Sequence, residues 1–221
     1  MASNHYEKSI QISQQISSST LKIILLGDFT TGKSTYMKSL SKKFHQAKFS
    51  DKLECPNCMI NKESYKVELH DPPRGIEEYR SLNPSYYRGA VGVIFFYDQT
   101  NYNTFLSIKS YWHKQLEEFR RPLEHELENP IMMLVRNKCD QNTNNMVSDL
   151  EEEALCKDLD IKLRVSVTSK TGVSVKRSWN RLMENIVRCV TENLKKNQFV
   201  SLDTVSFVND IPGKGTMCCF T

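Results

Sequence analysis

The chain contains the stretch Gly27-Asp28-Phe29-Thr30-Thr31-Gly32-Lys33-Ser34 directly after a short apolar run, Leu21 to Leu26. This stretch fits the pattern G-x-x-x-x-G-K-[ST] of a phosphate-binding loop, which lies between a strand and a helix. Its two glycines allow the backbone to wrap around a phosphate, and Lys33 offers a mobile positive charge to the β and γ oxygens. The hydroxyl of Ser34 is suited to ligate Mg²⁺. The loop predicts a bound nucleoside triphosphate but does not identify its base.

On both sides of this loop, apolar runs alternate with segments of helical periodicity. The helical segments include two apolar stripes, Phe105 to Phe119 and Val175 to Cys189, and Ser148 with Glu151 three residues later predicts a capping box for another helix. The alternation predicts an α/β fold with an open, mostly parallel sheet, whose ligands bind beyond the carboxyl ends of the strands. The runs expected to form buried strands are residues 21–26, 65–70, 90–97, 131–135 and 163–167.

Composition excludes several classes of protein. The 221 residues are 39% hydrophobic and 25% charged, which suits one domain with a sizeable core. The net charge of +4 is not concentrated in a basic arm, so we expect no nucleic-acid partner. The apolar runs are far shorter than the roughly 20 residues that a membrane-spanning helix needs.

The seven cysteines are expected to be thiols. No secretory signal is visible at the N-terminus, so we expect a reducing compartment. Cys55-Pro56-Asn57-Cys58 has the spacing of half a zinc site, but only His45 and His70 are nearby candidates for the two missing ligands. We therefore expect no metal at this pair.

A second set of polar residues follows two of the expected strands. Asn137-Lys138-Cys139-Asp140 comes after the run 131–135, and Thr168-Ser169-Lys170 comes after the run 163–167. The carboxylate of Asp140 can accept hydrogen bonds from N1–H and the exocyclic amine of guanine, whereas adenine would leave the charge unpaired. Lys138 can lie over the base plane, and backbone N–H groups of 168–170 can reach the guanine oxygen. Together with the phosphate loop, this set predicts a guanine nucleotide.

In these elements the chain resembles the Ras superfamily of small GTPases, and within it the Rab branch. The resemblance covers about residues 21 to 195 and includes an Asp-containing loop from Asp71, Ser85-Tyr86-Tyr87-Arg88-Gly89-Ala90 and Tyr97-Asp98-Gln99-Thr100. It implies a P-loop NTPase G domain with a six-stranded, mostly parallel sheet flanked by helices. It also implies a GTP/GDP cycle with Mg²⁺ and two switch loops that are recognised by effectors on membranes.

The resemblance also assigns residues to the site. Metal ligation falls to Ser34 and, through a water, to Asp71. The expected nucleotide-binding residues are Gly27, Thr30, Thr31, Gly32, Lys33, Ser34, Thr35, Asp71, Gly75, Asn137, Lys138, Asp140, Thr168, Ser169 and Lys170.

Three departures from the family pattern concern catalysis. After Asp71-Pro72-Pro73-Arg74-Gly75, the position at which the family has a water-orienting Gln is Ile76. No Thr lies between Thr35 and Thr100, so the switch residue that ligates Mg²⁺ is missing, with Ser50 the nearest hydroxyl substitute. Phe29 and Thr30 occupy positions where the family has small residues, and a phenyl group would crowd the γ-phosphate. No catalytic residue is assigned, and we expect slow hydrolysis.

The C-terminus is expected to carry lipid. Cys218 and Cys219 resemble the Cys-Cys-x-x ending of Rab proteins, which is geranylgeranylated on both thiols. One lipid chain gives marginal binding, and a second chain or a basic patch is needed for stable anchoring. The last 21 residues contain one Lys and two Asp, so no basic patch is available. The expected organisation is a flexible extension (1–20), a G domain (21–198) and a linker with the prenylation motif (199–221).

The predicted function is therefore a Rab-like, lipid-anchored GTP switch on the cytosolic face of an internal membrane, with a cytosolic pool, acting in vesicle traffic. Effector, exchange, activating and escort (GDI-type) proteins are its implied partners. A pseudo-GTPase adaptor that recruits partners regardless of nucleotide is the alternative. A P-loop kinase acting on a small metabolite would leave residues 137–140 without a task.

Overall fold

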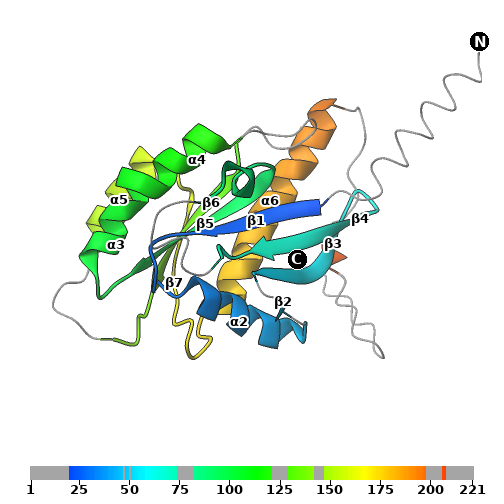
Figure 1. Ribbon diagram of the computed structural model, residues 1–221. Coiled ribbons are helices and arrows are strands. Elements are labelled where there is room, and N and C mark those ends of the chain that lie inside the picture. The colour runs from blue at the N-terminus through cyan, green and yellow to red at the C-terminus, as the bar shows by residue number, and fades with distance from the viewer. Residues whose placement is uncertain are drawn as a thin grey trace, which may run out of the picture.

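The computed structural model describes residues 20–46, 48–49, 51–73, 82–120, 129–141, 147–197 and 206–207. In these ranges one sheet has the main strand order β3-β4-β1-β5-β6-β7 (Figure 1). Two-residue strands β2 (Lys48–Phe49) and β8 (Ser206–Phe207) pair with β3. The expected α/β fold with a six-stranded main sheet is confirmed. The main strands are β1 (Thr20–Leu26), β3 (Lys52–Ile60), β4 (Glu63–His70), β5 (Ala90–Asp98), β6 (Ile131–Asn137) and β7 (Leu163–Ser166).

Parallel pairing brings the carboxyl ends of five strands to one edge. β1 pairs in parallel with β4 and β5, β5 with β6, and β6 with β7. The register places Ile24 opposite His70 and Asp98 opposite Asn137. Each strand is therefore followed at this edge by one of the loops that the sequence analysis selected.

β3 is antiparallel to β4, and the apolar runs did not predict it. Its burial alternates along the strand, as expected where only one face of a strand packs on the core. The pairing shifts register between Cys55 and Cys58, and this irregularity accommodates Pro56, which cannot donate to the ladder. Burial raises the pKa of both thiols, that of Cys58 to about 12, so neither is a reactive thiolate. In the described part of the chain, no three His, Cys, Asp or Glu side chains are grouped so as to hold a metal.

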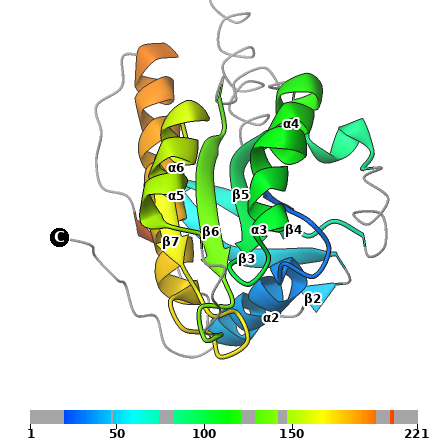
Figure 2. The ribbon, with the colours of Figure 1, turned by 90° about the vertical axis from the view of Figure 1, so that its left-hand side faces the viewer.

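Helices cover both faces of the sheet (Figures 1 and 2). α2 (Lys33–Phe44) and α6 (Val175–Asn197) cover one face. The other face is covered by α3 (Tyr102–Ser107), a π-helical segment η2 (Ile108–Trp112), α4 (His113–Phe119) and α5 (Asp149–Asp158). Among the helices of the described residues, none has both the length and the apolar composition required to cross a membrane.

The predicted local signals are largely confirmed. The stripe Phe105 to Phe119 forms one helical arm, although a π-helical segment and not a continuous α-helix occupies its middle. Ser148 and Glu151 form the expected capping box at the start of α5. A short 3₁₀ helix, η1 (Pro84–Tyr86), precedes β5.

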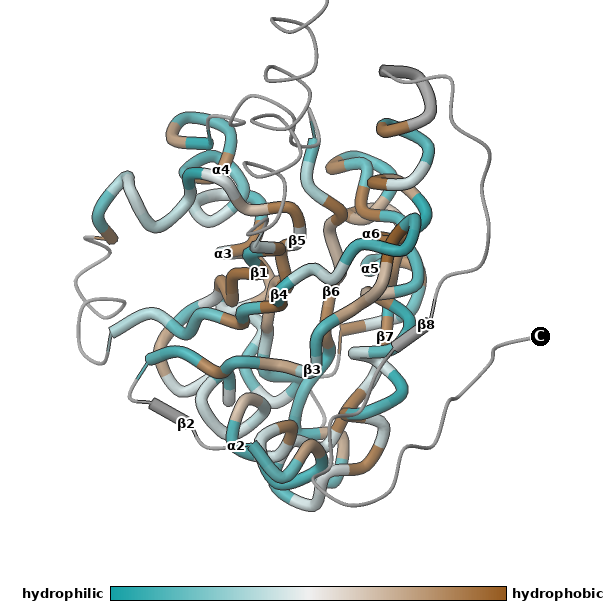
Figure 3. Tube along the Cα trace, turned by 90° about the vertical axis from the view of Figure 1, so that its right-hand side faces the viewer, coloured by the Kyte–Doolittle hydropathy of each residue, from teal (hydrophilic) through white to brown (hydrophobic). Residues whose placement is uncertain are grey.

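Two apolar clusters, one on each face of the sheet, form the core. The first joins β1 to α2 and α6 through Ile23, Met37 and Leu182, and the second joins β1 and β5 to the opposite helices through Ile24 and Trp112. Figure 3 shows the hydrophobic colour concentrated along the central strands β1, β5 and β6. The central strands are buried on both faces, which explains why their sequences are continuous apolar runs.

The core predicts a contrast between two leucines. Leu182 on α6 is fully buried, whereas Leu150 on α5 is 78% exposed. Leu182→Ala should lower the free energy of unfolding by about 2–5 kcal/mol, because it removes buried contacts and leaves a cavity. The same change at Leu150 should stay within about 0.5 kcal/mol. Urea denaturation of both variants measures the contrast, and equal midpoints would contradict this packing.

Candidate functional site

The loop after β1 requires glycine at two positions. Gly27 has φ 141°, and a Cβ there would lie 2.2 Å from the carbonyl oxygen of Phe96. Gly32, with φ 97°, is the N-cap of α2, and its Cβ would lie 2.1 Å from Nδ2 of Asn137. Side chains at these positions would push the loop away from β5 and β6.

Lys33 is held over this loop. Its side chain is buried, and Nζ donates to the carbonyl oxygens of Gly27 (2.8 Å) and Asp28 (2.7 Å) and to Oγ1 of Thr31 (3.3 Å). The ammonium is therefore fixed at the amino end of α2. α2 has neither a side-chain cap nor an acidic residue in its first turn. Its first N–H groups and Lys33 together form a cradle that fits a phosphate group.

The two expected metal ligands follow two paired strands, β1 and β4, at the same edge of the sheet. Ser34 is half-buried in the first turn of α2. Asp71 directly follows β4, is buried, and donates its backbone N–H to the carbonyl of Asp51 at 2.7 Å. A hydroxyl and a carboxylate are oxygen donors of the kind that Mg²⁺ takes, so this donor set fits the ion. Gly75 and Ile76, and also Ser50, lie outside the described residues.

Asn137 joins three loops. It is the last residue of β6 and is buried. Its Nδ2 donates to the carbonyl of Thr31 at 2.7 Å, and its Oδ1 accepts from the backbone N–H of Ser169 at 3.1 Å. The structure therefore brings the phosphate loop together with both predicted base-reading segments, which follow it by more than a hundred residues in sequence.

The residues expected to contact the base differ in exposure. Asp140 and Lys170 are exposed, whereas Thr168 and Ser169 are buried. The Ser169 hydroxyl has no hydrogen-bond partner among the described residues. Lys138 Nζ pairs with Asp98 Oδ2 at 2.5 Å, and its expected place over the base plane stays a prediction.

The loop surface carries an unusual aromatic residue. Phe29 is 47% exposed, and Thr30 beside it has φ 64°, a left-handed conformation that glycine adopts at lower cost. Thr35, the third residue of α2, is exposed. Asp28 is anchored from the other side, because the indole of Trp112 donates to its Oδ1 at 2.7 Å. The apolar stripe placed Trp112 in the core, but nothing in the pattern predicted its polar contact.

A buried ionic network below the base-reading loop was also missed. Glu152 on α5 accepts hydrogen bonds from the Tyr97 hydroxyl (2.5 Å) and from Arg136 on β6 (2.7 Å to Oε2). Arg136 also pairs with the exposed Asp149 at 2.7 Å. Burial opposes the charge of Arg136, but the bond to Glu152 raises its pKa overall. Arg136 and Glu152 lie 16 residues apart in sequence, and only their position on neighbouring elements indicates that they pair.

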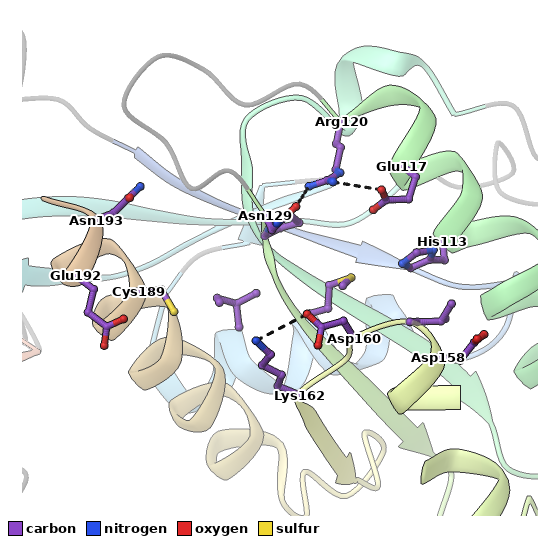
Figure 4. A pocket seen from close by; sticks show the side chains of 14 residues that line it. His113, Glu117, Arg120, Asn129, Asp158, Asp160, Lys162, Cys189, Glu192 and Asn193 are labelled. Atoms are coloured by element: carbon purple, nitrogen blue, oxygen red, sulfur yellow. Dashed lines mark hydrogen bonds and ion pairs between the residues drawn. The ribbon is translucent and has the colours of Figure 1, made fainter. Parts of the chain in front are cut away.

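A cavity of about 670 Å³ lies elsewhere on the molecule, between α4, α6 and the start of β6 (Figure 4). Ile131, the first residue of β6, lines it, whereas Asn137 ends the same strand, and seven extended residues span about 20 Å. Charged groups in its wall pair locally, as Arg120 does with Glu117 at 3.2 Å. None of the predicted nucleotide-binding residues lines this cavity, so the candidate site is the loop edge.

Comparison with known proteins agrees with this geometry. The model of the Ras family matches residues 22–188. Ras-related protein SEC4 of Saccharomyces cerevisiae is 30% identical over 188 residues, which cover 83% of this chain and 81% of that protein. GTP-binding protein ypt2 of Schizosaccharomyces pombe is 27% identical over 189 residues (83% and 90%). Ras-related protein Rab-8A of Bos taurus is 27% identical over 180 residues (80% and 83%).

The ionic network predicts a large effect from one charge. Glu152→Gln should lower the free energy of unfolding by about 2–3 kcal/mol, since the exposed Asp149 is then the one carboxylate that still pairs with Arg136 among the described residues. Glu153→Gln, the same change at the exposed neighbouring position, should have almost no effect. Urea denaturation of the two variants tests this, and a Glu152→Gln midpoint equal to that of Glu153→Gln would contradict it.

Proposed function

The chain belongs to the Rab family of the Ras superfamily of small GTPases, and from this premise we propose that it is a lipid-anchored guanine-nucleotide switch with slow GTP hydrolysis, acting in vesicle traffic. The observation that carries the proposal is the pair of hydrogen bonds made by Asn137, which unites the phosphate loop with the base-reading segments. A site with only a phosphate function would not need this junction.

Each part of the site has a task in this proposal. The amino end of α2 and Lys33 bind the phosphates, and the exposed carboxylate of Asp140 binds the two N–H donors of guanine. Ser34 and, through a water, Asp71 would hold Mg²⁺, which would neutralise phosphate charge. Gly75 belongs to the same proposed set.

Slow hydrolysis follows from departures from the family pattern in the phosphate loop and in the segment after Asp71. The side chain of Ile76 can neither donate nor accept a hydrogen bond, so it cannot orient the attacking water. Phe29 adds bulk on the solvent-exposed side of the phosphate loop and would hinder an arginine supplied by an activating protein. Pro72 and Pro73 remove two N–H donors after Asp71 and stiffen the start of the second switch.

A single preparation tests nucleotide choice and turnover. Protein purified without added nucleotide and then denatured should release a guanine nucleotide, and its single-turnover hydrolysis of GTP should be about tenfold slower than that of SEC4 prepared alike. Asp140→Asn is the specificity control, because an amide mismatches guanine and should shift preference toward xanthine nucleotides.

The other outcomes are informative. A rate equal to that of SEC4 would refute slow hydrolysis but keep the switch. An empty site would favour the adaptor that recruits partners without nucleotide, and tight ATP binding would favour a P-loop kinase. Release of GTP would indicate a membrane-attached protein that binds GTP without hydrolysing it.

Membrane attachment forms the second part of the proposal. Cys218 and Cys219, outside the described residues, carry two geranylgeranyl groups and place the protein on the cytosolic face of an internal membrane. An escort protein of the GDI type would keep a cytosolic pool, and exchange, activating and effector proteins would act on the membrane-bound form.

Labelling with a prenyl analogue in cells tests this attachment. The wild-type chain should incorporate label, and the double change Cys218→Ser with Cys219→Ser should abolish it. Cys189→Ser on α6 is the matched control and should label like wild type. Unlabelled wild-type protein would refute the lipid anchor.

A further inference from the structure

Gln99, directly after β5, makes three hydrogen bonds to one loop. Its side chain is buried, at 4% exposure, and Nε2 donates to the carbonyl oxygens of Lys138 (3.0 Å) and Gln141 (2.7 Å). Its backbone N–H donates to the carbonyl of Asn137 at 3.1 Å. Both amide hydrogens are therefore used, and both go to the loop that follows β6.

The two carbonyls that accept from the Gln99 side chain belong to the two end residues of a turn. Gln141 donates its N–H to the carbonyl of Lys138 at 3.0 Å, and Lys138 has φ 62°. Asp140 lies inside this turn and is exposed. The position of its carboxylate therefore depends on a backbone whose ends are both held by one amide.

The end of β5 is itself rigid. Asp98 accepts from the N–H (2.9 Å) and hydroxyl (2.8 Å) of Thr100, and its own N–H donates to Thr104 Oγ1 at 2.9 Å. Asp98 also pairs with Lys138, as described above. Gln99 thus connects a firmly bonded segment to the turn, whose other contacts among the described residues include the bond from the Cys139 N–H to the Val167 carbonyl at 3.4 Å.

We propose that Gln99 is a positioning residue that sets the guanine preference of the site by fixing the turn that presents Asp140. This inference rests on the proposed function, since it assigns a base to Asp140. Recognition of the exocyclic amine requires a carboxylate oxygen at one place, because hydrogen bonds weaken steeply with distance and angle. Hypoxanthine lacks this amine, so the preference for GDP over IDP reports on that oxygen.

A purely structural role makes a different prediction. If Gln99 only stabilises the fold, its loss lowers the melting temperature and lowers the affinities for GDP and IDP by the same factor. If it positions Asp140, its loss lowers the affinity for GDP more than the affinity for IDP, and the GDP-to-IDP affinity ratio falls.

The test uses the full chain and competition of GDP and IDP against a fluorescent GDP analogue. Gln99→Met keeps length and removes the amide, and it should lower the GDP-to-IDP affinity ratio about tenfold, the value of a lost hydrogen bond to a charged group. Gln99→Glu keeps the shape but opposes a carboxylate to two carbonyls, and it should lower the ratio at least as much. Gln115→Met on α4, whose amide contacts only Glu118 among the described residues, should leave the ratio unchanged.

The outcomes separate this inference from the proposed function. A wild type that binds no guanine nucleotide overturns both. A wild type that prefers GDP while both Gln99 variants keep its ratio overturns the inference alone. If neither variant folds, hydrogen exchange of the side-chain amides is measured in GDP-bound wild type. Exchange at Gln99 at least tenfold slower than at Gln115 supports the bonds from Gln99 to the turn, and equal exchange overturns the inference.

Discussion

Asn137 holds the candidate site together, because its single amide donates to the Thr31 carbonyl and accepts from the Ser169 N–H. The side chain is buried, so neither half of the amide can turn to water without losing a partner. Gly32 must lack a Cβ because Nδ2 of Asn137 lies where that atom would be. The conformation of the phosphate loop and the position of the base-reading segments are thus consequences of one contact.

The sheet makes this contact possible. Parallel strands place their carboxyl ends at one edge, so loops that follow β1, β6 and β7 meet there although long helices separate them in sequence. The end of β5 lies between them and is bonded both to β6, where Arg136 donates to the Tyr97 hydroxyl, and to the loop after β6, where Gln99 donates to the Lys138 carbonyl. The loops of the site are therefore held on the sheet by ion pairs and hydrogen bonds as well as by apolar packing.

In the proposed function, the same scaffold carries changed catalytic positions. Asn137 and the glycines of the phosphate loop, which build the shape of the site, match the pattern of the Rab family. Phe29 and Thr30 differ from it, yet they lie on the exposed surface of the loop, where a larger side chain does not disturb the core. In this proposal the fold and nucleotide binding persist while hydrolysis slows, since different residues determine them.

The sequence alone determined the phosphate loop, five of the six main strands, the capping box of α5 and the set of polar residues at the strand ends, because each of these is written in local periodicity or spacing. It could not reveal β3, because a strand with one buried face mixes polar and apolar residues as many loops do. Nor could it reveal the contacts of Trp112, Glu152 and Gln99. Those side chains acquire their partners from elements distant in the chain: Asp28 is 84 residues from Trp112, and Lys138 is 39 residues from Gln99. Only the tertiary structure decides such pairs, because a hydrogen bond depends on the distance between two atoms in space and leaves no period in the sequence.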